Sequence, residues 1–457
     1  MLRIALVAFL TVIIALKLAD FGMYSALNRG FDPVADFPLI ASLFDLLVGV
    51  VGRRVAIGAV LLTCALQALL IWVIWWATGV WSRLSRPTWF AHCAGALALV
   101  ALAAVLAEVG QNKRKWSLPF EIYGTAFTAR LGVERIQMVH KTASELRAFK
   151  LAVQEDPFAD HSSFFDLIDR DVLVIFIESN GRTSLDTPYY ADLHRATLLN
   201  AQYQLEELGL STASTILSSP TRGGQSWLAN STFASGLWID SQTRYGAALI
   251  SGRQTLYHLA QQSGFETAAV MPQITMDWPE SQFMGFDTTL AAKDLGYAGK
   301  PPNWVTMPDQ FTLGAMDRLL RHAKEDTPMF IQIALGTSHA PWVPVPQVID
   351  WDDLGDGSVF DPIVDASDPP RMVWRDHDRV RAQYRLAVDY ALQTVMAYAV
   401  LHAEDPPLMI VIGDHQAAGF VALDERSDVP MHIVGTKHLV EALADDQFFG
   451  PNPTLYS

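Results

Sequence analysis

The adjacent residues Asp414 and His415 follow an apolar run, residues 408–412, that is typical of a buried strand. Glu178 ends a second run of this kind, residues 172–177. Parallel strands present ligands and catalytic groups at their carboxyl ends. Carboxylate and imidazole groups can bind a divalent cation, and such a cation lowers the pKa of a bound hydroxyl enough to make it a nucleophile. The pattern therefore indicates a metal site that handles an oxyanion.

Thr221 is the candidate nucleophile of this site. It stands before Arg222 and two glycines, and residues 225–233 then have a helical pattern. The N–H groups at a helix start favour bound anions. His339 follows a third strand-like run, residues 329–335, and is expected at the same sheet edge. Taken singly, each residue also fits an ordinary turn, cap or surface role, but their coincidence at three strand ends favours a shared site.

The elements that must position these residues alternate along the chain from residue 171 onward. The strand-like runs are residues 172–177, 267–271, 329–335, 408–412 and 431–434. The helical runs are residues 188–208, 254–263, 310–323 and 380–402. This alternation predicts an α/β fold with a mainly parallel sheet flanked by helices. Residues 350–371, rich in Asp, Pro and Gly, are predicted to form a surface loop or a lid.

The beginning of the chain is predicted to lie in a membrane. Residues 55–82 and residues 87–107 contain no Asp, Glu, Lys or Arg, and each run is long enough to cross a hydrocarbon core of about 30 Å. Residues 4–16 are interpreted as an uncleaved anchor, and residues 37–52 as a short span, a re-entrant piece or an interfacial helix. Three or four crossings are therefore expected.

Three regions follow from this division. They are a transmembrane helical region at residues 1–110, a connector with an amphipathic helix at residues 111–170 and a catalytic domain at residues 171–457. Basic residues flank several span ends. Three spans would leave the larger clusters of basic residues outside the cytoplasm, whereas four spans would place both these clusters and the catalytic domain in the cytoplasm. Because Lys and Arg are enriched in cytoplasmic loops, the charge pattern alone favours four spans.

Composition excludes some classes of function. The formal net charge is −15, so a nucleic-acid partner is not expected, because such binding needs a basic face. Charged residues make up 18% of the chain and the mean hydropathy is +0.20, a high value for a soluble enzyme. Both cysteines, Cys64 and Cys93, lie within predicted spans. The catalytic region therefore has neither a disulfide nor a cysteine nucleophile.

The motifs, in their order, resemble the alkaline phosphatase and sulfatase superfamily over residues 170–440. They are Ile177-Glu178-Ser179, Thr221, Ser338-His339-Ala340-Pro341 and Gly413-Asp414-His415. The pattern is most similar to the membrane-anchored phosphoglycerol and phosphoethanolamine transferases, which include the lipoteichoic acid synthases. The resemblance implies that Glu178, Thr221, Asp414 and His415 bind one divalent metal, Mn²⁺ in the first place and Mg²⁺ or Zn²⁺ as alternatives. It also implies that His339 contacts the phosphoryl group.

The resemblance leaves two candidates for the nucleophile. The segment Ser218-Ser219-Pro220-Thr221-Arg222 mimics the Cys/Ser-x-Pro-Ser-Arg signature of sulfatases, which would nominate Ser218. In that signature a Thr-Gly pair begins nine positions after the nucleophile, but nine positions after Ser218 this chain has Trp227. Nine positions after Thr221 it has Asn230-Ser231, as in the lipoteichoic acid synthases, and this favours Thr221 as the nucleophile.

The resemblance implies an inner-membrane enzyme with a periplasmic catalytic domain. It would transfer a phospho-alcohol head group from a membrane phospholipid to a glycan or lipid acceptor through a phospho-threonine. Trp278 would line the head-group pocket and Arg222 would offset charge, but Glu280 stands where the synthases have an Arg, which puts glycerol phosphate as the transferred group in doubt. The alternatives are a sulfatase-like hydrolase or phosphodiesterase of the same fold and a non-catalytic membrane assembly module.

Overall fold

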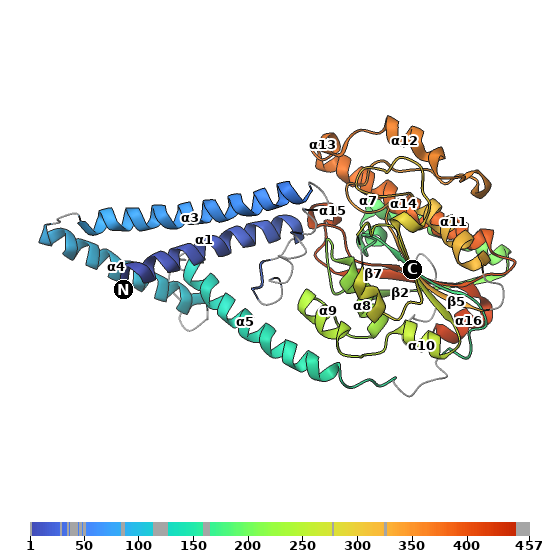
Figure 1. Ribbon diagram of the computed structural model, residues 1–457, viewed down its shortest axis with the longest axis horizontal. Helices are drawn as coiled ribbons and strands as arrows, with labels where there is room; N and C mark the ends of the chain where they lie inside the picture. The colour runs from blue at the N-terminus through green and yellow to red at the C-terminus, as the bar shows by residue number, and fades with distance from the viewer. Residues whose placement is uncertain are drawn as a thin grey trace. The chain divides into compact units, whose positions relative to one another are not determined.

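The computed structural model of the chain forms two compact units, Met1–Phe149 and Lys150–Ser457 (Figure 1). The structure describes residues 2–27, 30–33, 36, 44, 48, 52–83, 87–112, 127–158, 165–276, 278–323 and 327–444. Each unit is described separately below.

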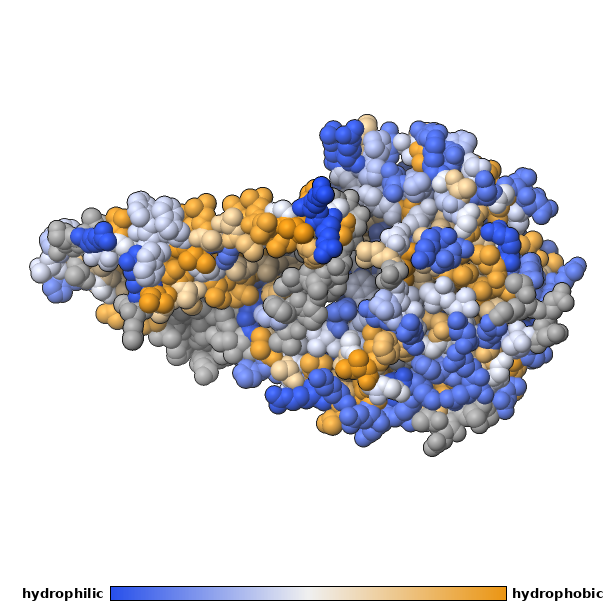
Figure 2. Space-filling model, in the orientation of Figure 1, coloured by the Kyte–Doolittle hydropathy of each residue, from blue (hydrophilic) through white to orange (hydrophobic). Residues whose placement is uncertain are grey.

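Long helices form the described part of the first unit, and all of them except α5 are strongly apolar. They are α1 (Leu2–Leu27), α3 (Arg53–Arg83), α4 (Thr88–Asn112) and most of α5 (Phe127–Ala152). Helices α1 and α3 run antiparallel, since Arg3 at the start of α1 donates to the Thr78 hydroxyl near the end of α3, at 3.2 Å, and lies 3.8 Å from the ring centre of Trp75. Figure 2 shows hydrophobic residues along the helices of this unit.

Two described helical segments are long and apolar enough to cross a membrane, Arg3–Met23 and Arg53–Arg83. Helix α4 covers the third predicted span, and its apolar part within the described residues is Thr88–Ala104. The possible fourth span, residues 37–52, falls outside the described residues except at single positions. The number of crossings therefore stays a prediction, while the helix predicted in the connector is present as α5.

A mixed sheet of seven strands forms the centre of the described part of the second unit. The strands are β1 (Val172–Ile177), β2 (Leu210–Ser218), β3 (Glu266–Met271), β4 (Thr288–Ala291), β5 (Met329–Leu335), β6 (Leu408–Gly413) and β7 (Asp428–Thr436). Their order is β2-β7-β6-β1-β5-β3-β4. The five strands from β6 to β4 are parallel, and β7 pairs antiparallel with both β6 and β2. The predicted, mainly parallel α/β sheet is confirmed.

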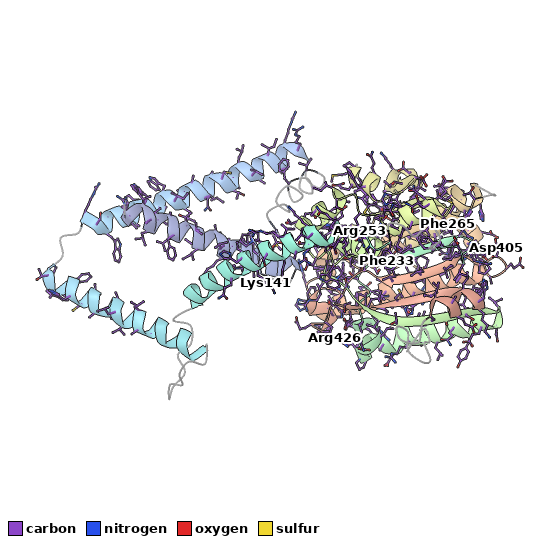
Figure 3. All side chains as sticks on the ribbon, turned by 90° about the horizontal axis from the view of Figure 1, so that it is seen from below. Lys141, Phe233, Arg253, Phe265, Asp405 and Arg426 are labelled. Atoms are coloured by element: carbon purple, nitrogen blue, oxygen red, sulfur yellow. The ribbon has the colours of Figure 1, made fainter. Side chains whose placement is uncertain are left out.

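Helices cover both faces of this sheet. They are α6 (Thr183–Asp186), α7 (Pro188–Glu207), α8 (Ser226–Ser235), α9 (Gln242–Leu249), α10 (Leu256–Gln262), α11 (Asp309–Leu319), α12 (Asp361–Ala366), α13 (Pro370–Val373), α14 (His377–Leu401), α15 (Gly419–Ala422) and α16 (Lys437–Leu443). Alternate residues of β1 divide the core, as expected from strand periodicity. Leu173 and Ile175 join the cluster with α7, α11 and α14, whereas Val174 joins the cluster with α8, α10 and α16. Phe233 and Phe265, labelled in Figure 3, belong to the second cluster or pack against it.

The prediction of a loop at residues 350–371 is wrong, because short helices occupy most of this segment. They are η4 (Trp351–Asp353), η5 (Ser358–Phe360), α12 and the beginning of α13. Proline stands in the first turn of both α-helices, where its missing N–H costs nothing. Leu354 and Phe360 are buried and fix the segment to the core.

A buried network of charged residues lies at the amino ends of the parallel strands. In Figure 3 this is the end of the sheet at which Asp405 is labelled, and Arg426 is labelled at the opposite end. Arg321 donates to the carboxylates of Asp171, at 2.7 Å, and Asp317, at 3.1 Å. It also donates to the Tyr398 hydroxyl at 2.7 Å. This network connects the start of β1 with α11 and α14 at the amino ends of the parallel strands.

Arg321→Ala should lower the free energy of unfolding by about 3–5 kcal/mol, because two largely buried carboxylates would lose their counter-charge. Lys437→Ala is the control, since the Lys437–Glu441 pair is exposed and should contribute less than about 1 kcal/mol. Denaturant unfolding of the full chain in detergent micelles, followed by tryptophan fluorescence, measures both. Equal effects of the two substitutions would contradict the role of the network.

Candidate metal centre

The strand register brings the sequence-predicted residues to one edge of the sheet. Ile177 of β1 pairs with Gly413 of β6 on one side and with Leu335 of β5 on the other. Glu178 and Asp414 therefore leave neighbouring strands at the same level. The chain after β1 passes so close to β6 that a Cβ at Gly413 would lie 1.9 Å from the Asn180 carbonyl oxygen. Glycine is thus required at position 413 for the two strand ends to meet.

Glu178, Asp414 and His415 form a compact cluster in which one ligand atom from each lies within 4.8 Å of the others. Nε2 of His415 is 3.1 Å from Oε1 of Glu178 and 3.7 Å from Oδ2 of Asp414. The side chains of Asp414 and His415 are almost fully buried. Backbone N–H groups of Ser179 and His415 donate to Oδ1 of Asp414 at 2.8 and 2.6 Å, which fixes the carboxylate in place.

The three ionisable groups strongly influence one another. Burial raises the pKa of Asp414 well above its ordinary value, and the charge of Glu178 raises it further. Burial also tends to raise the pKa of Glu178, but attraction to the nearby His415 outweighs this effect and lowers the pKa. For His415, burial is outweighed by both carboxylates, so the pKa is raised to about 9. The cluster therefore stabilises positive charge at its centre.

The histidine is oriented by its other ring nitrogen. Nδ1 of His415 lies 3.0 Å from the carbonyl oxygen of Gln416 and can donate only in that direction. This hydrogen bond leaves Nε2 facing the carboxylates, where it has no hydrogen-bonding partner of good geometry among the described residues. Such an arrangement is the usual way in which proteins fix a metal-binding imidazole.

Thr221 is held directly against the Asp414–Gln416 segment. The hydroxyl of Ser219 donates to the carbonyl of Asp414 at 2.6 Å, and the N–H of Gly223 donates to the carbonyl of Gln416 at 2.8 Å. Thr221 lies midway between these two attachments and is only 6% exposed. Its hydroxyl oxygen is buried and has no hydrogen-bonding partner in the described part of the chain. A buried hydroxyl without a partner is costly, so this one calls for an explanation.

The turn after Thr221 leads into α8 and adds a residue that sequence reasoning missed. Gly223 and Gly224 have φ values of 75° and 143°, which allow the sharp reversal of the chain. Helix α8 then begins at Ser226, whose hydroxyl donates to Oε2 of Glu178 at 2.8 Å. Ser226 thereby orients the glutamate, and a serine at a helix start gives no sequence signal that distinguishes this role from capping.

His339 lies in the loop after β5, close enough to Glu178 for its charge to lower the pKa of that carboxyl group. The hydroxyl of Ser338 donates to the Glu178 carbonyl at 2.7 Å and so joins this loop to the loop after β1. Nδ1 of His339 contacts the carbonyl of Ala340. The three strand ends that the sequence predicted to converge are therefore directly connected.

Asp309, the first residue of α11, holds the base of the His339 loop. Its Oδ1 accepts from the N–H groups of Gly336 and Thr337, both at 2.8 Å, while its own N–H donates to the Thr337 hydroxyl at 2.9 Å. Oδ2 is buried and has no partner among the described residues. Burial raises the pKa of Asp309 to about 6, although the hydrogen bonds from Thr337 and Gly336 oppose the shift.

Asp309→Asn should therefore have a pH-dependent effect on stability. Because the folded-state pKa of about 6 exceeds the ordinary value of 3.8, the wild-type protein loses up to about 3 kcal/mol as the pH rises from 4 to 7. The asparagine keeps the acceptor for both N–H groups and cannot ionise, so it avoids this loss. The difference in melting temperature, variant minus wild type, should increase between pH 4 and pH 7 and then level off.

Thermal unfolding of the full chain in micelles across this pH range checks the expectation. Asp309→Ala is the control, because it removes the acceptor as well as the ionisable group and should stay about 1–3 kcal/mol less stable than Asp309→Asn at every pH. A difference between Asp309→Asn and the wild type that is independent of pH would show that Asp309 stays ionised.

The remaining candidates lie in ordinary contacts. The guanidinium of Arg222 pairs with Glu425 at 2.8 Å. Trp278 is half-buried and packs against Phe286, with ring centres 6.2 Å apart. The hydroxyl of Ser218 donates to Asp428 at 3.2 Å and is exposed. Ser218 thus has a partner, in contrast to Thr221.

The residues present fit a divalent cation. Two carboxylates and one imidazole supply hard and borderline ligands of the usual kind for Mn²⁺, Mg²⁺ or Zn²⁺. Nε2 of His415 and the hydroxyl oxygen of Thr221 are buried polar atoms without a hydrogen-bonding partner among the described residues, as expected of atoms that bind a cation. The structure therefore contains a candidate metal site of three clustered ligands, and the segment that carries Thr221 is hydrogen-bonded to the Asp414–Gln416 segment.

Comparisons with known proteins agree with this fold. A family model described as sulfatase matches residues 171–431, a range that contains Glu178, Thr221, His339, Asp414 and His415. No curated protein matches the chain in sequence. Similar solved structures include the lipoteichoic acid synthase LtaP from Listeria monocytogenes, with 16% identity, a TM-score of 0.39 and coverage of 64% of this chain and 71% of that one.

Two further structures are similar to the same extent. The phosphoglycerol transferase GacH from Streptococcus pyogenes, in complex with sn-glycerol-1-phosphate, has 13% identity and a TM-score of 0.39, with 65% of this chain and 74% of that one covered. The soluble domain of lipooligosaccharide phosphoethanolamine transferase A from Neisseria meningitidis has 13% identity and a TM-score of 0.40, with 64% and 83% covered.

Proposed function

The chain belongs to the sulfatase family, and from the site that it carries we propose that it transfers a phospho-alcohol head group between a membrane phospholipid and a glycan or lipid acceptor. A phospho-threonine at Thr221 is the intermediate. The observation that carries this proposal is the buried hydroxyl of Thr221, which has no partner within the described chain and is tied by its neighbours to the Asp414–Gln416 segment.

Glu178, Asp414, His415 and Thr221 would hold one divalent cation, with Mn²⁺ as our first choice and Mg²⁺ or Zn²⁺ as alternatives. When bound, the cation would lower the pKa of the Thr221 hydroxyl and offset negative charge on the phosphoryl oxygens. The chain's own contribution is to hold the ligands rigid: Ser226 fixes Glu178, and backbone N–H groups fix Asp414.

The reaction takes place in two displacements at phosphorus. The oxygen of Thr221 forms a bond to the phosphorus of the lipid phosphodiester, and the bond to the diacylglycerol oxygen breaks. The proton of the threonine hydroxyl ends on the released diacylglycerol. An acceptor hydroxyl then attacks the phospho-threonine, and its proton restores the threonine. His339, beside Glu178, would contact the phosphoryl oxygens, a position consistent with its electrostatic effect on that carboxylate.

Two further residues are assigned roles at the substrate. Trp278 would line the head-group pocket with the part of its ring that is not packed against Phe286. Arg222 would offset charge near Thr221, although its guanidinium is paired with Glu425. Both assignments remain proposals that rest on sequence position.

We place the catalytic unit on the periplasmic side of the inner membrane. Two candidate spans near the amino terminus support membrane attachment. The second unit has no cysteine, which suits an oxidising compartment. An odd number of crossings would put the amino terminus inside and the catalytic unit outside.

Mass spectrometry of the peptide that contains Thr221 tests the proposal. The full chain in micelles is incubated with bacterial phospholipids and Mn²⁺, quenched in acid and digested. A mass increase on Thr221 is expected, and its value identifies the head group. Modification of Ser218 instead, or none under turnover, would overturn the proposed intermediate. Release of the group to water at the same rate with and without added acceptor would establish the hydrolase alternative.

A further inference from the structure

A row of aromatic rings leads from the candidate metal centre to the surface of the second unit. Trp342 packs edge-on against Tyr384 at 5.6 Å and stacks almost parallel to Trp374 at 5.8 Å between ring centres. Trp374 in turn lies 6.2 Å from Trp304. Exposure increases along this row, from fully buried Tyr384 to 3% for Trp342, 36% for Trp374 and 63% for Trp304.

The inner part of this row is attached to the candidate site. The hydroxyl of Tyr384 donates to the carbonyl of Ser179, the residue after Glu178, at 2.9 Å. The indole N–H of Trp342 donates to the carbonyl of Ser338 at 2.8 Å. The indole N–H of Trp374 donates to the carbonyl of Pro341 at 3.2 Å. These hydrogen bonds fix the positions of Trp342 and Trp374 relative to the loop that carries His339.

Trp304 is exposed but not loosely attached. Asn303 before it adopts a left-handed backbone with φ of 59° and donates through Nδ2 to the carbonyl of Val343 at 2.6 Å. The loop that contains Trp342 and Val343 therefore fixes the turn that carries Trp304. Tryptophan is largely buried in most proteins, and a ring of this size held in water by a rigid turn suggests a binding role.

A cleft lies beside the chain segments that carry two of these rings, because Val343, next to Trp342, and Val373, next to Trp374, line it. It has a volume of about 200 Å³. Its polar lining residues are Ser367, Asp368, Arg379 and Gln383, and the rest of its lining is apolar. Asp368 and Arg379 form an ion pair of 2.6 Å, and Gln383 adds an amide. Helices α12, α13 and the start of α14, which supply several of the lining residues, lie together at one edge of the unit (Figure 1).

This combination of groups matches the chemistry of a carbohydrate. The C–H face of a hexose ring stacks on an indole, and its neighbouring hydroxyls pair with carboxylate, guanidinium and amide groups. A lipid surface would instead favour aliphatic side chains and a net basic rim. The exposed charges here have both signs, with Asp368 and Asp376 beside Arg371 and Arg379.

We propose that Trp304, Trp374 and the cleft of Asp368, Arg379 and Gln383 form a carbohydrate subsite that holds the acceptor glycan. This inference rests on the proposed transfer reaction and selects a glycan over a lipid as its acceptor. The subsite places a sugar hydroxyl on the side of the centre from which the loop of His339 projects.

Binding of neutral gluco-oligosaccharides to the full chain in detergent micelles tests the subsite. Trp304→Ala should weaken the affinity about tenfold, which corresponds to about 1.4 kcal/mol. Trp304→Phe should recover most of the affinity, because it restores an aromatic face. Trp238→Ala is the matched control, since Trp238 is 46% exposed elsewhere in the unit and should leave binding unchanged.

The outcomes separate this inference from the proposed function. Absence of oligosaccharide binding by the wild type would overturn the subsite. So would equal effects of Trp304→Ala and Trp238→Ala, or a Trp304→Ala defect confined to binding of phosphatidylglycerol vesicles. Release of the head group from phosphatidylglycerol and from phosphatidylethanolamine by the wild type is measured in parallel. Oligosaccharide binding without any release would leave the subsite standing and refute the transfer reaction.

In a turnover assay, the Trp304→Ala defect should lie in the KM for the acceptor rather than in kcat. A purely structural role of Trp304 would lower kcat and the melting temperature together.

Discussion

Thr221→Ala should reduce head-group release by about 10⁴-fold or more while leaving the melting temperature of the protein nearly unchanged. The loss of rate is large because the proposed covalent intermediate cannot form without the hydroxyl. The fold should tolerate the change because that hydroxyl makes no hydrogen bond in the described part of the chain, so its removal leaves no donor or acceptor unpaired. Initial rates with phosphatidylglycerol and thermal unfolding of the same preparation measure the two effects.

Two further variants make this prediction specific. Thr221→Ser keeps a hydroxyl and should restore activity well above that of the alanine variant. Ser218→Ala removes the competing nucleophile, whose hydroxyl bonds Asp428 at the exposed end of β2, and should leave the rate nearly unchanged. An active Thr221→Ala protein, or an inactive Ser218→Ala protein, would refute the assignment of the nucleophile.

The central strands could be predicted from sequence because they are apolar on both faces. In β1, β5 and β6 nearly every residue is buried, which produces the continuous apolar runs that parallel strands require. The edge strands were missed. Strand β2 has a hydroxyl group on five of its nine residues, and β4 has only four residues and none that is fully buried. Such strands are recognisable only once their neighbours in the sheet are known.

The clustering of Glu178, Asp414 and His415 was within reach of sequence reasoning for a related reason. Each follows directly on a strand, and β1 lies between β5 and β6 in the sheet. Groups at the carboxyl ends of adjacent parallel strands must be neighbours. The supporting contacts were not predictable in this way. Ser226 and Asp309 reach the site from helix starts, where serine and aspartate are common as caps.

Glu178→Gln should weaken Mn²⁺ binding by more than about 100-fold and abolish turnover, since it replaces a charged ligand by a neutral amide. It should also lower the stability of the metal-free protein, because the attraction between Glu178 and His415 that lowers the pKa of this carboxyl group would be lost. Titration of the full chain with Mn²⁺, together with thermal unfolding in a chelator, measures both quantities. Binding as tight as in the wild type would exclude Glu178 as a ligand.

Ser226→Ala should weaken Mn²⁺ binding less than Glu178→Gln does. It removes only the hydrogen bond of 2.8 Å that orients Glu178, so Mn²⁺ affinity should fall by about 10–100-fold and excess Mn²⁺ should restore the rate. Excess metal should not rescue Glu178→Gln, because the ligand itself is gone. A site that acts without a cation predicts the opposite pattern, in which Mn²⁺ concentration affects neither variant. The difference in rescue between two residues joined by one hydrogen bond thus tests the metal role of the cluster separately from its role in folding.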